Sequence, residues 1–170
     1  MNDGLSFYFT WPGQQTGVLV YLIFIFANTL LNALVLRRLD TYPAPSNWPS
    51  VSVLIPARNE EETIRRCVGS LIAQDYPAYD IWVLDDGSTD DTAAILSELS
   101  ADHANLTVLS GQPLPNGWLG KPWACCQLAE ASESELLLYV DSDTWHHPQM
   151  LRDAVAALEA EQADLLSVIP

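Results

Sequence analysis

The most constraining feature of the sequence is an apolar run, residues 136–140, that ends in two carboxylates, Asp141 and Asp143. A short apolar run bounded by polar residues predicts a buried strand. In an open parallel sheet, ligands bind just beyond the carboxyl ends of the strands, and both aspartates are expected there. Two carboxylates this close repel each other, which favours protonation of one or a cation between them. Oxygen ligands suit Mg²⁺ or Mn²⁺, so the first hypothesis is a metal–diphosphate site. The alternative is a strand-to-loop turn with solvated acids.

Strand-like runs alternate with helix-like apolar stripes from residue 51 onward. Strands are predicted at 51–55, which Pro56 ends, at 81–84, 106–109 and 136–140, and a fifth is predicted to begin at 165–169. Helices are predicted at 64–72, around 95–99, at 124–131 and, beginning at Pro148, at 151–158, with a Gly- and Pro-rich loop over 110–122. This alternation predicts an α/β fold with a Rossmann-like, mainly parallel sheet.

Acidic residues follow the carboxyl ends of three predicted strands, so they are expected along one edge of the sheet. They are Glu60, Asp85, Asp86, Asp141 and Asp143. The formal net charge is −15 with only 7 Lys and Arg, which argues against a nucleic-acid partner. An anionic ligand would therefore need metal ions and backbone N–H groups to hold it. The three cysteines form no C-x-x-C pair, which favours buried thiols in a reducing compartment.

The amino-terminal part carries a long uncharged segment, residues 17–36. Its length and apolarity predict one transmembrane helix, and a secretory signal peptide or a buried core helix fits it less well. Arg37 and Arg38 follow at once, so the positive-inside rule places this end in the cytoplasm and the protein in the cell (inner) membrane, as a single-pass chain. The predicted organisation is a tail and membrane helix at 1–38, a Pro-containing linker at 39–50, and an α/β domain at 51–170.

Three other motifs that bind nucleotides or phosphates are excluded by particular residues. A dinucleotide fingerprint would need Gly-x-Gly-x-x-Gly, which the sequence lacks. Gly120 and Lys121 suggest a phosphate loop, but Pro115 and Pro122 occupy positions that need Gly and Ser or Thr. The segment after Asp141 is similar to the motif of haloacid-dehalogenase-type phosphatases, but Trp145 stands where they have Thr or Val.

Three motifs in order resemble the family 2 inverting glycosyltransferases of GT-A fold. They are Pro56-Ala57-Arg58-Asn59-Glu60, then Asp85-Asp86-Gly87-Ser88-Thr89-Asp90, then Asp141-Ser142-Asp143. With an amino-terminal membrane helix, the loop at 117–123 is similar to the hopanoid- and carotenoid-associated branch. The resemblance covers residues 51–170, about the amino-terminal, donor-binding half of such an enzyme.

The resemblance implies a role for each matched residue. Pro56, Ala57, Arg58 and Glu60 would line the nucleotide of a nucleotide-sugar donor, expected to be UDP-linked, and Asp86 would hydrogen-bond the base. Asp141 would approach the ribose or diphosphate, and Asp143, with Asp141, would hold Mg²⁺ or Mn²⁺. Lys121 has two alternative roles. It would either contact a phosphate of the donor or be a solvated lysine of the loop.

The resemblance also implies transfer of the sugar to a lipid, isoprenoid-type or other acceptor. The family's general base follows the fifth strand, so it is expected beyond Pro170, and the 170 residues alone are expected to bind donor without useful transfer. Two alternative functions are a nucleotidyltransferase-like protein and a non-catalytic nucleotide-binding membrane protein. A nucleotidyltransferase should carry a Gly-rich, basic loop after the first strand, and none is present.

Overall fold

The computed structural model describes residues 11–35 and 38–168. The chain forms two compact units, Met1–Thr41 and Tyr42–Pro170, and each is described by itself. Arg37, one of the two arginines used above to predict topology, lies outside the described residues, as do Leu36, Ile169 and Pro170.

The first unit is dominated by helix α2, Trp11–Val35. At about 1.5 Å per residue its 25 residues extend for roughly 38 Å, longer than the hydrocarbon layer. Its apolar side chains are exposed, and by length and composition it qualifies as a membrane span. A signal sequence near an amino terminus satisfies the same criterion. A short 3-10 helix, η1 (Leu39–Thr41), follows, where Arg38 forms an ion pair with Asp40 at 2.8 Å.

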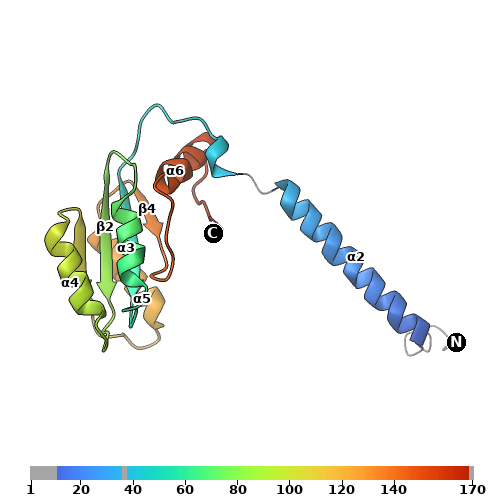
Figure 1. Cartoon of the computed structure of the whole chain (residues 1–170), viewed down its shortest axis with the longest axis horizontal. Helices are drawn as coiled ribbons and strands as arrows, with labels where there is room; N and C mark the ends of the chain where they lie inside the picture. Colours follow the sequence, from blue (N-terminus) through green and yellow to red (C-terminus); the bar gives the residue numbers. More distant parts are fainter. Residues whose placement is uncertain (1–10, 36–37, 169–170) are drawn as a thin grey trace. The chain divides into compact units, whose positions relative to one another are not determined.

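The second unit is built on a parallel sheet of four strands in the described part of the chain (Figure 1). The strands are β1 (Val51–Ala57), β2 (Tyr79–Asp85), β3 (Leu106–Ser110) and β4 (Leu136–Tyr139), in the spatial order β3-β2-β1-β4. The helices are α3 (Ile64–Ile72), α4 (Thr92–Asp102), α5 (Gly120–Ala131) and α6 (Met150–Glu161). The predicted α/β fold with a parallel sheet is confirmed.

Helices cover both faces of the sheet, and alternate residues of each strand enter one of two cores. On one face, Val53 and Ile55 of β1 pack with buried residues of α3, α4 and α6, as the stripes on those helices predict. On the other face, Leu54 packs with Leu84 of β2 and with Leu128 of α5. The central strand β1 is therefore buried on both sides, which explains its nearly continuous apolar sequence.

Strand β1 continues through Pro56 to Ala57, so the prediction that Pro56 ends the strand is wrong. Alternate residues of a strand bond to opposite neighbours. Ala57 accepts from the Asp86 N–H, next to β2, whereas Leu54 accepts from the Val140 N–H, next to β4. Pro56 therefore faces the β4 side, where the paired register has already ended at Leu54 and Tyr139. Its missing N–H interrupts no ladder bond there, which is how the sheet accommodates a proline.

The prediction that the strand before Asp141 is buried is also wrong. Leu137 and Tyr139 of β4 are 43% and 48% exposed. The cause is position, because β4 is an edge strand in the described part of the chain while α5 packs on β1 and β2. An apolar run of four residues does not report which face a helix covers.

Two boundaries differ from the sequence prediction. Residues 165–168 form no strand, because none of them joins the backbone ladder that defines one, and Leu165 is 85% exposed. Helix α5 begins at Gly120, inside the predicted loop, and contains Lys121 and Pro122. Proline is tolerated in a first helical turn because the N–H groups there have no intrahelical partner.

The buried Cys67 thiol makes the stability of the second unit depend on pH in the alkaline range. Burial, followed by the negative charge of Asp143, raises the pKa of Cys67 to about 12. The unfolded thiol ionises near 9, so above that pH the folded state holds more protons and stability falls as pH rises. We expect the wild-type free energy of unfolding to lose about 1.4 kcal/mol per pH unit from this group between 9 and 12.

The measurement compares the wild-type full chain with Cys67→Ala by denaturant unfolding in detergent from pH 8 to 10.5. Other titrating groups are common to both proteins and cancel in the difference. The alanine variant is expected to be less stable at pH 8, and its deficit should shrink as pH rises. A deficit that stays constant across the range would contradict the buried neutral thiol.

Candidate functional site

The candidate site lies at the carboxyl ends of β1, β2 and β4. From β1 the chain adds β2 and β3 on one side and then returns to add β4 on the other, so the direction of winding reverses between β1 and β4. Such a switch point opens a crevice in parallel α/β sheets. Ala57 ends β1, Asp86 follows β2, and Asp141 lies two residues after β4.

The loops that follow β1 and β2 are joined by a network of hydrogen bonds. Asn59 has a left-handed backbone, with φ of 55°, and its N–H donates to the Ser88 hydroxyl at 2.9 Å. The Asn59 side-chain oxygen accepts from the Thr89 N–H at 2.8 Å, and the Glu60 N–H donates to the Thr92 hydroxyl at 2.8 Å. These contacts fix the two loops side by side.

Two of the predicted acidic residues make local structural contacts. The Glu60 carboxylate accepts from the Thr63 hydroxyl at 2.7 Å, next to the start of α3. The Asp85 carboxylate accepts from the Ser88 N–H at 3.0 Å and closes the turn after β2. Glu60 nevertheless belongs to the same acidic neighbourhood as Asp141 and Asp143, because all three charges act on the Cys67 thiol.

Asp86 occupies a narrow niche formed by a loop and a helix end. The Arg58 guanidinium lies 3.7 Å from its carboxylate. A Cβ atom on Gly111 would stand 3.1 Å from one carboxylate oxygen and 3.2 Å from the Asp86 Cα, and one on Gly120 would stand 3.5 Å from the other oxygen. The absence of side chains at these two glycines therefore makes the space for Asp86. Sequence reasoning assigned no role to Gly111, which is 25 positions distant from its neighbour Asp86.

Lys121 connects the niche of Asp86 with Asp141, which follows β4. Its ammonium donates to the Asp141 carboxylate at 2.5 Å, and the side chains are 63% and 60% exposed. That hydrogen bond raises the pKa of Lys121, so the lysine stays charged at neutral pH. Because Gly120 lies beside Asp86, the first turn of α5 joins Asp86 to Asp141.

The turn that carries Asp141 and Asp143 is fastened to α3. The Asp141 carbonyl accepts from the Thr144 hydroxyl at 2.7 Å and from the Cys67 thiol at 3.6 Å. The His146 N–H donates to the Ser70 hydroxyl at 3.0 Å. The Asp143 side chain is exposed and makes no hydrogen bond or ion pair with another residue in the described ranges. Its exposed carboxylate is thus held on a fixed turn.

The chemistry of these donors fits a divalent ion only in part. Among residues 11–35 and 38–168, no three His, Cys, Asp or Glu side chains lie close enough to hold an ion by themselves. Mg²⁺ commonly takes one or two carboxylates and completes its shell with water and substrate phosphates. Asp143 is free for such a role, whereas Asp141 is paired with Lys121 in this structure. The arrangement suits an ion that arrives with a diphosphate.

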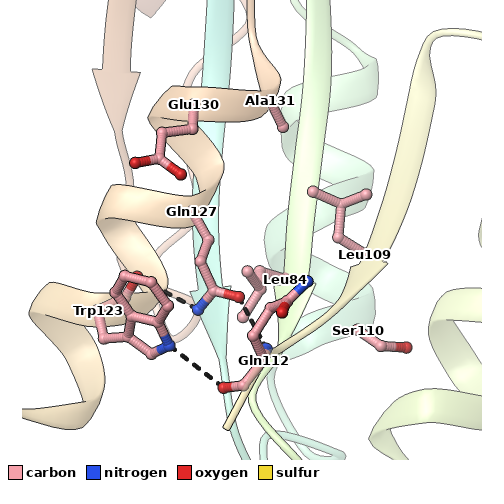
Figure 2. Close-up of a pocket in the computed structure, with 8 residues that line it drawn as sticks. All are labelled: Leu84, Leu109, Ser110, Gln112, Trp123, Gln127, Glu130 and Ala131. Carbon is pink, nitrogen blue, oxygen red and sulfur yellow. Dashed lines mark hydrogen bonds between the residues drawn. The ribbon is translucent and has the colours of Figure 1, made fainter. Parts of the chain in front are cut away.

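An open pocket of about 470 Å³ lies elsewhere, between α5 and the β2 and β3 strands (Figure 2). Its lining residues are Leu84, Leu109, Ser110, Gln112, Trp123, Gln127, Glu130 and Ala131. None of the predicted site residues lines it, so we assign it no part in binding a nucleotide.

The comparisons with known proteins identify the family. The family described as Glycosyl transferase family 2 matches residues 52–169. The chain belongs to this family. A beta-monoglucosyldiacylglycerol synthase of Nostoc sp. (strain PCC 7120) is 33% identical over 122 residues, which are 71% of this chain and 26% of that protein. A 4,4'-diaponeurosporenoate glycosyltransferase of Staphylococcus haemolyticus is 35% identical over 123 residues, 71% of this chain and 32% of that protein.

Solved structures of glycosyltransferases confirm the GT-A fold. Staphylococcus aureus TarS 1–349 in complex with UDP-GlcNAc superposes with a TM-score of 0.56 at 33% identity, over 66% of this chain and 32% of that one. The mannosyltransferase PcManGT from Pyrobaculum calidifontis, in complex with GDP-Man and Mn²⁺, gives 0.62 at 25% identity over 81% of this chain and 39% of that one. The chain thus spans about a quarter to two fifths of the length of the proteins it resembles here.

Proposed function

We propose that the second unit is the donor-binding half of a glycosyltransferase that uses a UDP-linked sugar. The observation that carries the proposal is that one helical turn, at Gly120 and Lys121, brings together Asp86 and Asp141 from two separate strand ends. A carboxylate can accept from the N–H of a uracil ring, and a lysine and a metal can meet a diphosphate. Asp86 and Asp141 lie along one sheet edge, an arrangement that suits the base and the diphosphate of one nucleoside diphosphate.

Each residue then has a part in holding the donor. Asp86, in its niche between Gly111 and Gly120, accepts from the base, while Pro56, Ala57 and Arg58 line the nucleotide. Asp143, with Asp141, holds Mg²⁺ or Mn²⁺, which neutralises the negative charge of the leaving diphosphate. Lys121 exchanges its contact with Asp141 for one with a phosphate. The exposure of both side chains makes that exchange inexpensive, because surface ion pairs contribute little.

The test is calorimetric binding of UDP to the full chain in detergent, with Mn²⁺ and then with excess chelator. We expect UDP to bind with Mn²⁺, and to bind at least about tenfold more weakly without it, since the chain offers few cations at this edge. UMP, which lacks the second phosphate, is the control ligand and should show little metal dependence. Equal UDP binding in both conditions would refute the metal role, and no binding in either would refute the donor site.

We further propose a lipid acceptor and a cytoplasmic location for the second unit. Two of the relatives are named for diacylglycerol and diaponeurosporenoate, and α2 has the length and composition of a membrane span. Arg37 and Arg38 at its carboxyl end favour the cytoplasmic side. A bacterial reporter pair fused after Pro170 should therefore show a cytoplasmic enzyme active and a periplasmic one inactive. The reverse pattern would overturn this orientation and leave the donor site unaffected.

A further inference from the structure

The loop between β3 and α5 exposes three large apolar side chains. Leu114, Trp118 and Leu119 are 54%, 44% and 74% exposed. We call residues 111–119 the apolar loop. Burial of side chains of this size stabilises a protein by about 1.5–3 kcal/mol each, so leaving three of them in water on one short loop indicates a surface that meets something apolar.

The apolar loop has a defined conformation, so its exposure is fixed by the fold. Gly117 has a positive φ of 88°, and the Trp118 N–H donates to the Pro115 carbonyl at 3.2 Å. The Trp118 ring packs edge-on against Trp123, with ring centroids 5.2 Å apart. Trp123 is itself held by its indole N–H, which donates to the Gln112 carbonyl at 3.2 Å (Figure 2). The contact with Trp123 holds the loop in place, while Trp118 stays 44% exposed.

The apolar loop itself differs in charge from the rest of the chain, although Asp86 lies against Gly111 at its start. The protein carries 22 Asp and Glu, yet none of them lies between Ser110 and Ala129, and Lys121 is the only charged residue there. Anionic headgroups repel carboxylates, and the apolar loop itself carries none, while Lys121, just after it, is paired with Asp141. Tryptophan, with an apolar body and a polar N–H, is enriched at the level of the headgroups. The loop therefore complements a bilayer surface that most of this acidic chain would avoid.

We infer that the apolar loop inserts into the headgroup region of the membrane in which α2 is proposed to be anchored. This inference rests on the proposed function, which it deepens by naming the surface that faces the acceptor. Gly120 and Lys121 follow the loop directly, so insertion holds the edge that carries Asp86 and Asp141 at the bilayer surface. A lipid hydroxyl can then reach the donor without the lipid leaving the membrane.

The experiment places a small fluorophore at position 119 of the full chain in lipid vesicles. The labelled protein is Leu119→Cys with Cys125→Ser and Cys126→Ser, while the buried Cys67 is retained. The matched control carries the label at Ala104→Cys, an exposed position in the turn that precedes β3 at the opposite end of that strand. Lipids with brominated acyl chains report insertion, and aqueous iodide reports exposure to water.

We expect brominated lipid to quench most of the fluorescence at 119 and little at 104, with iodide showing the reverse. In addition, Leu114→Asp should reduce lipid quenching at 119 more than the neutral Leu114→Asn does, because a carboxylate opposes entry into the interface. Iodide quenching at 119 equal to that at 104 would overturn the inference. So would protection from iodide without lipid quenching, which would indicate a protein surface instead. UDP binding is measured on the same samples, so loss of the donor site and loss of insertion are told apart.

Discussion

Asp143→Asn is expected to weaken UDP binding in the presence of Mn²⁺ by at least about tenfold and to leave the weak, chelator-resistant binding unchanged. The substitution keeps the shape of the side chain and removes its charge. Asp143 is exposed and makes no hydrogen bond or ion pair with another described residue, so the substitution should not disturb the fold. Binding isotherms of the full chain with and without Mn²⁺ give the four affinities needed.

Asp102→Asn is the matched control for the change in charge. Asp102 is an exposed carboxylate at the end of α4, and its substitution should change neither affinity nor metal dependence. Asp141→Asn gives a second comparison, because it removes the carboxylate partner of Lys121 as well as a proposed ligand. If Asp143→Asn kept full metal dependence while Asp141→Asn lost it, the ion would be assigned to Asp141 alone.

Gly111→Val is expected to reduce UDP affinity by about tenfold or more and to destabilise the second unit by about 1–3 kcal/mol. A side chain at this position must displace the Asp86 carboxylate, 3.1 Å from the new Cβ, or the backbone at 3.2 Å. The Gly111 N–H also donates to the Asp85 carbonyl at 2.8 Å, so the loop cannot simply move away. Thermal unfolding and UDP calorimetry measure the two effects.

Gly69→Ala is the control for the loss of a glycine. An added Cβ on Gly69 meets no atom within 4 Å, and the residue lies inside α3, where alanine is favoured by about 0.5–1 kcal/mol. This variant should bind UDP normally and unfold at a slightly higher temperature. Normal UDP binding by Gly111→Val would show that Asp86 does not need its niche to contact the base.

The strand and helix order was predictable because it depends on local periodicity. The stripe Ile64, Cys67, Val68 and Leu71 marks the buried face of α3, and each of these residues is fully buried. The place of the acidic residues followed from topology alone, since parallel strands present their carboxyl ends at one edge. These features require no knowledge of which side chains meet across the sheet.

The parts that sequence reasoning missed depend on contacts between distant segments. Nothing near Gly111 in the sequence indicates that it lies over Asp86, and nothing near Asn59 indicates that Ser88 and Thr89 are its partners. The sequence did indicate a turn at each place. Asparagine, as at Asn59, tolerates a left-handed backbone, and the loop after β2 contains Gly87 and Ser88, which favour turns. The exposure of β4 was unpredictable for a similar reason, since it depends on where α5 packs.

Pro56 limits how far two neighbouring strands can join. Each further step of the ladder between β1 and β4 needs an N–H from the residue of β1 that faces β4, and at Pro56 that donor does not exist. Backbone pairing of β1 with β4 therefore does not continue past this level. This limit on pairing lies in the covalent structure of Pro56, so it is present whether or not a ligand is bound.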